Sequence, residues 1–360
     1  MTSIFDTISL PVRAMKAIMT TPKQPKMLFV ISSPRSGSTM LERMLESHTQ
    51  IQGGPEPHIL TPLAHLGFWD KVDKAPYDHI LAAESQKLFV SKLPNQDEDY
   101  WKACRTYCDV LYGQFMENTE KTICLDKTPA YGLILPFMAK VFPDAKFVVL
   151  TRHPIATFSS FANSFFDGDY QTAQDHNPLL NRYVPAIAQF LRQTDVQFFH
   201  VQYEDLVQDP ERWMEKIYDY IEIPFEADTV NYGEKKQERD SQEGLGDPIG
   251  VQKHSRPSTA SLHKWVEELS ADNQKLTMIQ TIVQQIDPAD LETVGYPVQG
   301  LWKPLEEAEG KSFAPKKEKL SRYRLQRKAI IRLRTLAQKN GFVRGILKKI
   351  NLASDVLLRD

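Results

Sequence analysis

The sequence lacks long apolar runs and internal repeats, and it has only three cysteines. No stretch of about 18 apolar residues is present, which argues against a membrane-spanning helix. The apolar stretch near the start contains Asp6 and Arg13, so it does not have the separate regions of a secretory signal. The cysteines cannot all pair within the chain, and no metal-ligand spacing surrounds them. We therefore expect a cytoplasmic protein with reduced thiols and no metal site.

Charge is unevenly spread along the 360 residues, although the net charge is only −2. Residues 315–360 contain 14 lysines and arginines against three acidic residues, so the rest of the chain is acidic. A nucleic-acid enzyme is disfavoured, because its basic residues should cluster on the folded face. Apolar and basic residues interleave in this tail, which is typical of a basic amphipathic helix. It could pack on the acidic body, lie on an anionic membrane or bind an acidic partner, and these alternatives stay open.

Apolar runs and helical patterns alternate along the chain. Residues 27–32 and 146–151 read as buried strands, residues 196–203 read as a third strand, and amphipathic segments lie between them. This alternation predicts an α/β fold, with a parallel sheet flanked by helices. In the first amphipathic segment, Glu42, Arg43 and Glu46 are expected to point away from the core.

The domain organisation follows from composition. We expect an N-terminal extension over residues 1–26, one main domain over 27–297 and a basic helical tail over 298–360. The stretch from 232 to 261 is polar and rich in turn residues, and it is long for an idle loop. It is therefore expected to form a lid.

The segment between the first strand and the first helix has the composition of an anion site. It contains Arg35, Ser36, Gly37, Ser38 and Thr39. A strand–loop–helix junction of this kind offers backbone N–H groups and the positive end of a helix to a phosphate. Ser38 occupies the position of the lysine in the usual nucleotide-triphosphate loop, and the cation precedes the glycine instead. A P-loop-like nucleotide site with a displaced cation is predicted.

A second basic signature follows the strand at 146–151. Arg152 comes directly after this strand, and Ser160 lies eight residues later in the next predicted helix. Both are expected at the carboxyl edge of the sheet, where open α/β sheets bind their ligands.

Together and in this order, the two signatures resemble those of the sulfotransferases that use 3′-phosphoadenosine 5′-phosphosulfate, in the style of bacterial and tyrosyl-protein members. The resemblance covers about residues 27–269. It implies that the first loop holds the 5′-phosphosulfate and that Arg152 and Ser160 hold the 3′-phosphate. Lys127, in Leu-Asp-Lys-Thr-Pro, resembles the family's lysine beside the sulfuryl group. Tyr203, in Tyr-Glu-Asp-Leu, resembles its tyrosine near the adenine.

Two neighbouring residues are candidates for the catalytic base. Glu56 lies between two prolines that stiffen the chain, and it resembles the catalytic glutamate of tyrosyl-protein sulfotransferases. His58 matches the histidine of cytosolic members in type but not in place. Glu56 is favoured and His58 stays open.

The expected lid carries further cations. Lys253 and Arg256 are expected to contact the donor when the lid closes over it. His254, between them, is a third and weaker candidate for the base.

The resemblance implies a sulfotransferase of the EC 2.8.2 type, which moves a sulfuryl group to an acceptor hydroxyl, or less readily an amine, and releases adenosine 3′,5′-bisphosphate. Arg35 and Lys127 would neutralise the charge on the leaving phosphate, so no metal is expected. Two alternatives stay open: a P-loop-type kinase, and a catalytically silent nucleotide-binding protein tethered by its basic tail.

Overall fold

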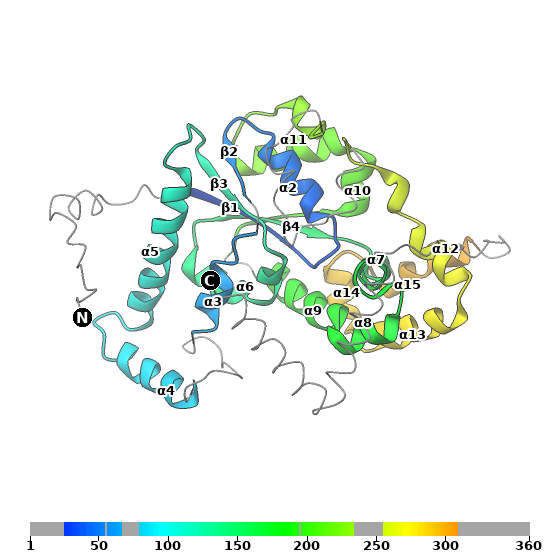
Figure 1. The fold of residues 1–360 in the computed structure, drawn as a ribbon, viewed down its shortest axis with the longest axis horizontal. Coiled ribbons are helices and arrows are strands. Elements are labelled where there is room, and N and C mark those ends of the chain that lie inside the picture. Colours follow the sequence, from blue (N-terminus) through cyan, green and yellow to red (C-terminus); the bar gives the residue numbers. More distant parts are fainter. Residues whose placement is uncertain (1–24, 55, 67–78, 194–195, 234–254, 309–360) are drawn as a thin grey trace, which may run out of the picture.

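The computed structural model describes residues 25–54, 56–66, 79–193, 196–233 and 255–308. In this part of the chain, five parallel strands form one sheet in the order β2-β3-β1-β4-β5 (Figure 1). The strands are β1 Lys26–Ser32, β2 Ile51–Gln52, β3 Ile123–Asp126, β4 Lys146–Thr151 and β5 Phe198–Gln202. The predicted α/β class is confirmed. The sequence patterns predict β1, β4 and β5 but not β2 and β3, which are too short to produce a clear pattern.

Helices occupy the connections between the strands. The α-helices within the described residues are α2 Ser38–Glu46, α3 Leu60–Ala64, α4 His79–Val90, α5 Asp97–Met116, α6 Leu135–Val141, α7 Pro154–Phe166, α8 Tyr170–His176, α9 Leu179–Leu191, α10 Tyr203–Gln208, α11 Pro210–Ile221, α12 Lys264–Ser270, α13 Asn273–Gln284, α14 Pro288–Thr293, α15 Val298–Leu301 and α16 Lys303–Glu306. Short 3₁₀ segments are η1 Pro129–Leu133, η2 Ala227–Val230 and η5 Thr259–Ser261. No described helix is long and apolar enough to cross a membrane.

Local sequence signals account for several helix starts. Asp209 caps α11 by accepting a hydrogen bond from the backbone N–H of Arg212. Pro154 stands in the first turn of α7, where its missing N–H has no partner to lose. The predicted boundary of the main domain at residue 297 stays a prediction, but Leu301 and Ala308 are buried in the same core as the sheet.

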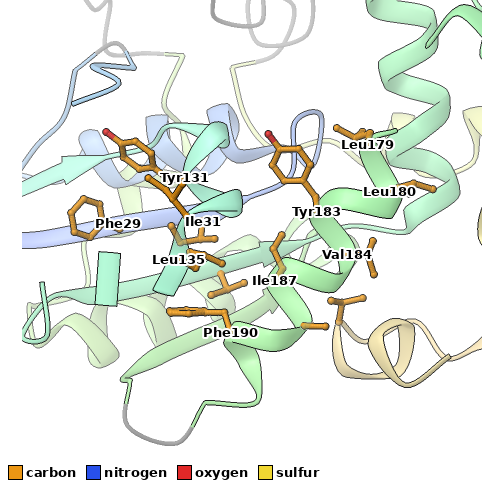
Figure 2. Close-up of a cluster of buried hydrophobic side chains, with 14 of the residues drawn as sticks. Phe29, Ile31, Tyr131, Leu135, Leu179, Leu180, Tyr183, Val184, Ile187 and Phe190 are labelled. Carbon is orange, nitrogen blue, oxygen red and sulfur yellow. The ribbon is translucent and has the colours of Figure 1, made fainter. Parts of the chain in front are cut away.

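The central strand β1 divides the interior into two cores. Leu28 and Val30 face a core that α2, α10 and α11 complete on one side of the sheet. Phe29 and Ile31 face the larger core on the other side, formed with α5, α6, α7 and α9. Figure 2 shows Phe29 and Ile31 beside the side chains of η1, α6 and α9. Alternate side chains of a strand point to opposite faces, so a continuous apolar run fits a sheet covered on both sides.

Four strands end at one edge of the sheet. The loop of residues 33–37 follows β1, Lys127 follows β3, Arg152 follows β4 and Tyr203 follows β5. Because the strands are parallel and adjacent, their carboxyl ends bring these residues to the same edge of the sheet.

Candidate functional site

The loop after β1 is held in an unusual backbone conformation. Arg35 has a φ of 70° and Gly37 a φ of 91°, both in the left-handed region. A Cβ atom on Gly37 would overlap the ring of Tyr203, so this position requires glycine for its space as well as its backbone angle. The ring of Tyr203 therefore lies against the loop.

The polar side chains of the loop are largely enclosed. Ser36 is buried, and its hydroxyl lies 2.7 Å from that of Ser33. Ser38 is buried and Thr39 half-buried in the first turn of α2. The N–H groups of Met40 and Leu41 donate to the carbonyl oxygen of Gly37, whereas those of Ser38 and Thr39 come too early in α2 to have a carbonyl partner within the helix. The loop thus presents the start of a helix beside a permanent cation, Arg35.

Arg152 ties three distant segments together. Its guanidinium donates from Nη1 to the carbonyl oxygen of Arg35 at 3.0 Å and from Nη2 to that of Ser261 at 3.2 Å. The same group lies 4.4 Å from the centre of the Tyr203 ring. The hydroxyl groups of Tyr203 and Ser261 are 2.9 Å apart. The Arg152 Nε atom is buried with no hydrogen-bond partner among the described residues.

Ser160 joins the same cluster from α7. Its hydroxyl oxygen accepts a hydrogen bond from Arg35 Nε at 3.3 Å, although the two residues are 125 positions apart. Arg35 also lies near the ring of Phe165, 6.0 Å from its centre. The structure therefore brings together Arg35 of the first signature with Arg152 and Ser160 of the second, and Tyr203 lies beside them.

A neighbouring hydrogen-bond network holds α12, and with it Ser261, against α7. Glu268 accepts hydrogen bonds from Ser159 at 2.6 Å and from Asn163 at 2.7 Å. Its other oxygen pairs with Lys275 at 2.6 Å. Ser159 therefore has a structural partner here, whereas the neighbouring Ser160 hydroxyl points to Arg35.

Lys127 lies between two carboxylates at the end of β3. Its ammonium is 2.5 Å from Glu56 Oε1 and 3.3 Å from Glu42 Oε2. The Lys127 side chain is only 2% exposed. Burial by itself would lower the pKa of Lys127, but the negative charges of Glu42 and Glu56 outweigh it and raise the pKa above the usual value. Lys127 is thus held charged inside the protein.

The two candidate bases stand side by side. Glu56 Oε2 is 3.7 Å from His58 Nε2, while the other oxygen of Glu56 pairs with Lys127. The side chain of Glu56 is 17% exposed and that of His58 41%. Glu56 is the more enclosed of the two and has the charged partner Lys127, and the choice of Glu56 as the base stays a prediction.

The buried carboxylate of Asp126, which directly precedes Lys127, supports this part of the site. Asp126 accepts hydrogen bonds from Tyr112 at 2.6 Å, from Tyr131 at 3.0 Å and from Thr128 at 3.0 Å. The Tyr131 hydroxyl in turn accepts one from the N–H of Leu60 at 3.2 Å. This chain of bonds links the end of β3 to the segment that carries Glu56. Burial raises the pKa of Asp126 to about 6, although its hydrogen bonds lower it.

Two acidic residues of α2 lie elsewhere than the amphipathic pattern predicts. Glu42 and Glu46 are both buried rather than exposed, so the expectation that they point away from the core is wrong. Glu42 lies one helical turn after Ser38 and therefore on the same side of α2 as the loop. That spacing is the signal that could have identified Glu42; for Asp126, the signal is a carboxylate closing an apolar strand.

Only part of the predicted lid lies within the described residues. Lys253 and His254 lie outside the described residues. Arg256 is described, and its guanidinium donates to Asn231 Oδ1 at 3.5 Å and pairs with Glu211 at the start of α11. Those contacts are with the protein surface and give no support to the predicted contact of Arg256 with the donor.

Comparison with known proteins identifies the family. A sequence model of the Sulfotransferase family matches residues 25–227, which is more than half of the chain. The chain belongs to the sulfotransferase family. Among curated relatives of this sulfotransferase, nodulation protein NoeE of Sinorhizobium fredii is 28% identical over 141 residues, which cover 39% of this chain and 32% of that protein. Protein-tyrosine sulfotransferase 1 of Danio rerio is 24% identical over 268 residues, 70% of this chain and 69% of that one.

A further relative and two solved structures complete the comparison. The protein-tyrosine sulfotransferase of Drosophila melanogaster is 22% identical and is matched over 49% of its length, so this sulfotransferase spans about half of it and about a third of NoeE. The sulfotransferase domain of the Synechococcus olefin synthase is 25% identical, with a TM-score of 0.46 over 73% of this chain and 98% of that one. The sulfotransferase domain of the curacin biosynthetic pathway is 22% identical, also with a TM-score of 0.46, over 67% and 90%.

The cluster fits the anionic donor that the family implies. Among the described residues, Arg152 carries a buried N–H without a partner, and its guanidinium contacts two backbone carbonyls and the Tyr203 ring, which are uncharged. Gly37 keeps the loop free of a side chain where the ring of Tyr203 meets it. Arg35 and Lys127 add two more cations at the same edge of the sheet. A half-buried cation with an unused N–H donor is the arrangement that a phosphate group completes.

Proposed function

We propose that this protein transfers a sulfuryl group from 3′-phosphoadenosine 5′-phosphosulfate to an acceptor hydroxyl. The observation that carries the proposal is the meeting of Arg35 and Arg152, 117 residues apart, through a 3.0 Å hydrogen bond at the carboxyl edge of the sheet. Lys127 and Glu56 follow neighbouring segments of that edge and form a 2.5 Å ion pair. The end with Arg35 and Arg152 suits a phosphate, and the end with Lys127 and Glu56 suits removal of a proton.

The chain's own residues divide the work between binding and chemistry. Arg152 and Ser160 would hold the 3′-phosphate, and Tyr203 would bound the adenine side of the site. The loop N–H groups with Ser36, Ser38 and Thr39 would hold the 5′-phosphate. Arg35 and Lys127 would neutralise charge as it builds up on the leaving phosphate.

Glu56 would take the proton of the acceptor. When bound, the donor supplies a sulfuryl group already activated by its bond to phosphate. As in phosphoryl transfer, little covalent chemistry is then left to the protein, and positioning with charge stabilisation carries the rate. His58, at 3.7 Å from Glu56, is placed to stabilise the carboxylate or to replace it.

The acceptor is proposed at the level of its chemistry. Two of the relatives are named protein-tyrosine sulfotransferases, which supports a hydroxyl-bearing acceptor. No observation among the described residues favours the kinase alternative, and Ser38 stands where such an enzyme carries its lysine.

Two experiments test the proposal. Calorimetric titration of the full chain with adenosine 3′,5′-bisphosphate should show binding, and ATP with magnesium should not compete. Incubation of a cell extract with the protein and radiolabelled donor should label a defined acceptor. Absence of bisphosphate binding together with absence of labelling would refute the function.

The basic tail, residues 315–360, lies outside the described residues, so its contacts stay a prediction. Retention of the full chain on anionic liposomes, lost on deletion after Pro315, would support a peripheral membrane contact. Equal behaviour of the two proteins would favour packing on the acidic body or an acidic partner.

A further inference from the structure

Glu42 is a buried acid with a specific partner in the site. It lies on α2, four residues after Ser38, and its carboxylate is 3.3 Å from the ammonium of Lys127. The side chain is only 5% exposed. A carboxylate in such a place costs several kcal/mol of desolvation unless a cation compensates it. Lys127, which directly follows β3, is a cation that compensates this charge.

The cluster of Lys127, Glu42 and Glu56 has more negative than positive charge. One ammonium faces two carboxylates, Glu42 and Glu56, so the three groups together carry an excess of one negative charge. Lys127 can therefore part from one of the two carboxylates and still keep the other as a counter-ion.

The two carboxylates are not equivalent. Glu42 is fixed on a helix and enclosed, whereas Glu56 lies on an irregular segment, is 17% exposed and borders His58. Glu56 is thus the partner that an acceptor can reach. Glu42 is the partner that stays beside Lys127.

We propose that Glu42 is a positioning residue that keeps the Lys127 ammonium charged and in place while Glu56 leaves the ion pair and accepts the acceptor's proton. This inference rests on the proposed function and adds the residue that makes the base separable from the lysine. The acceptor oxygen forms the new bond to sulfur, the bond from sulfur to the phosphate oxygen breaks with its electron pair going to the phosphate, and the proton passes to Glu56. Lys127 then retains one buried counter-ion, Glu42, at the moment when charge on the leaving phosphate is greatest.

Loss of Glu42 should therefore change the protonation of Lys127. Burial favours the neutral amine, and the nearby carboxylates oppose it, so removal of one carboxylate lowers the pKa of Lys127. In Glu42→Gln, the alkaline limb of the kcat profile should move to lower pH, since less of the enzyme keeps the ammonium. Turnover at neutral pH should fall about tenfold, as expected for one lost charge-assisted hydrogen bond.

The chain offers a matched control on the same helix. Glu46 is also buried and lies one turn after Glu42, but its carboxylate packs against Gly53. Glu46→Gln removes the same charge from the same element with the same change of shape. It should affect the free energy of unfolding without moving the titration of Lys127.

The decisive readout does not need the donor. The full chain is labelled with [ε-¹³C]lysine, the Lys127 signal is assigned by its loss in Lys127→Arg, and the signal is followed against pH. Lys127 should lose its proton at lower pH in Glu42→Gln than in the wild type or Glu46→Gln. Glu42→Asp should give a smaller shift and recover part of the turnover. Affinity for adenosine 3′,5′-bisphosphate should stay unchanged in all three variants.

The opposite results overturn the inference. An unshifted Lys127 titration in Glu42→Gln, or an equal shift in Glu46→Gln, means that Glu42 does not hold the lysine. If Glu42→Gln does not fold, Glu42→Asp still has to shift the signal. A wild type that binds no bisphosphate refutes the proposed function, whereas the lysine titration still reports whether Glu42 holds the charge.

Discussion

Arg152 and Lys127 are both cations that directly follow a strand, but their surroundings differ in kind. Arg152 contacts two backbone carbonyls and the Tyr203 ring, all uncharged, and keeps one buried N–H without a partner among the described residues. Lys127 is enclosed between the carboxylates of Glu42 and Glu56. The charge of Arg152 is therefore available to an anion, whereas that of Lys127 is already shared. The first arrangement suits tight binding, and the second suits an exchange of partners during a reaction.

The largest effect is expected at the reacting end of the site. Glu56→Gln should lower kcat by roughly 10²–10⁴, because the acceptor's proton loses its base, while affinity for adenosine 3′,5′-bisphosphate is kept. Initial rates at saturating donor and a calorimetric titration measure the two quantities. His58→Gln serves as the matched control and should keep most of the turnover. Near-normal turnover in Glu56→Gln would assign the base to His58 instead.

Replacement of Lys127 and of Arg152 by methionine should lower the free energy of unfolding by different amounts. Lys127→Met removes the cation that both Glu42 and Glu56 contact, so the free energy of unfolding should fall by about 3–5 kcal/mol. Among the described residues, Arg152 contacts uncharged partners, so Arg152→Met should be destabilised much less. Urea unfolding at neutral pH compares the two variants. Equal losses would contradict the distinction drawn between their surroundings.

The binding end is expected to respond in affinity rather than rate. Arg152→Ala should weaken binding of adenosine 3′,5′-bisphosphate about 10- to 100-fold, because hydrogen bonds to charged groups are lost. The value of kcat at saturating donor should change little, since the 3′-phosphate is remote from the reacting sulfur. Arg152→Lys, which keeps the charge but not the forked geometry, should fall between. A fall in kcat with unchanged affinity would place Arg152 at the reacting end.

The smallest effect concerns Asp126, which precedes Lys127. Burial raises the pKa of Asp126 to about 6, above the value of about 4 of an unfolded chain. The folded state therefore binds the Asp126 proton more tightly than the unfolded chain does. The stabilisation that this bound proton gives the folded state is complete below about pH 4 and is lost as pH rises through 6. The difference in unfolding free energy between the wild type and Asp126→Asn should change between about pH 4 and 6 and stay constant above that range. A difference that does not vary with pH would contradict the raised pKa.

Much of the donor side could be predicted from the sequence. The apolar runs of β1 and β4 are long enough to mark buried strands, and each is followed by polar residues at a strand end. Arg35, Gly37 and Arg152 follow these strands directly, and Ser160, farther along in α7, was added by the family resemblance. The contact of Gly37 with Tyr203 then explains why the loop needs a glycine.

The reacting side was less predictable. The strand β3 has only four residues, so its pattern is weak, and Lys127 was found through family resemblance alone. Glu42 was predicted to face solvent, because helical periodicity separates apolar from polar faces and cannot identify a polar residue that faces a buried polar site. Asp126 was missed because burial with three donors is a property of packing, not of spacing.

The sequence by itself determined the α/β class, the order of the two basic signatures and the chemical types of the groups that follow the strands. Only the tertiary structure decided which charges neutralise each other. Ion pairing depends on distances of a few ångströms between residues such as Glu42, Glu56 and Lys127, which are far apart along the chain. Those distances arise when parallel strands align their carboxyl ends, and no local pattern specifies that alignment.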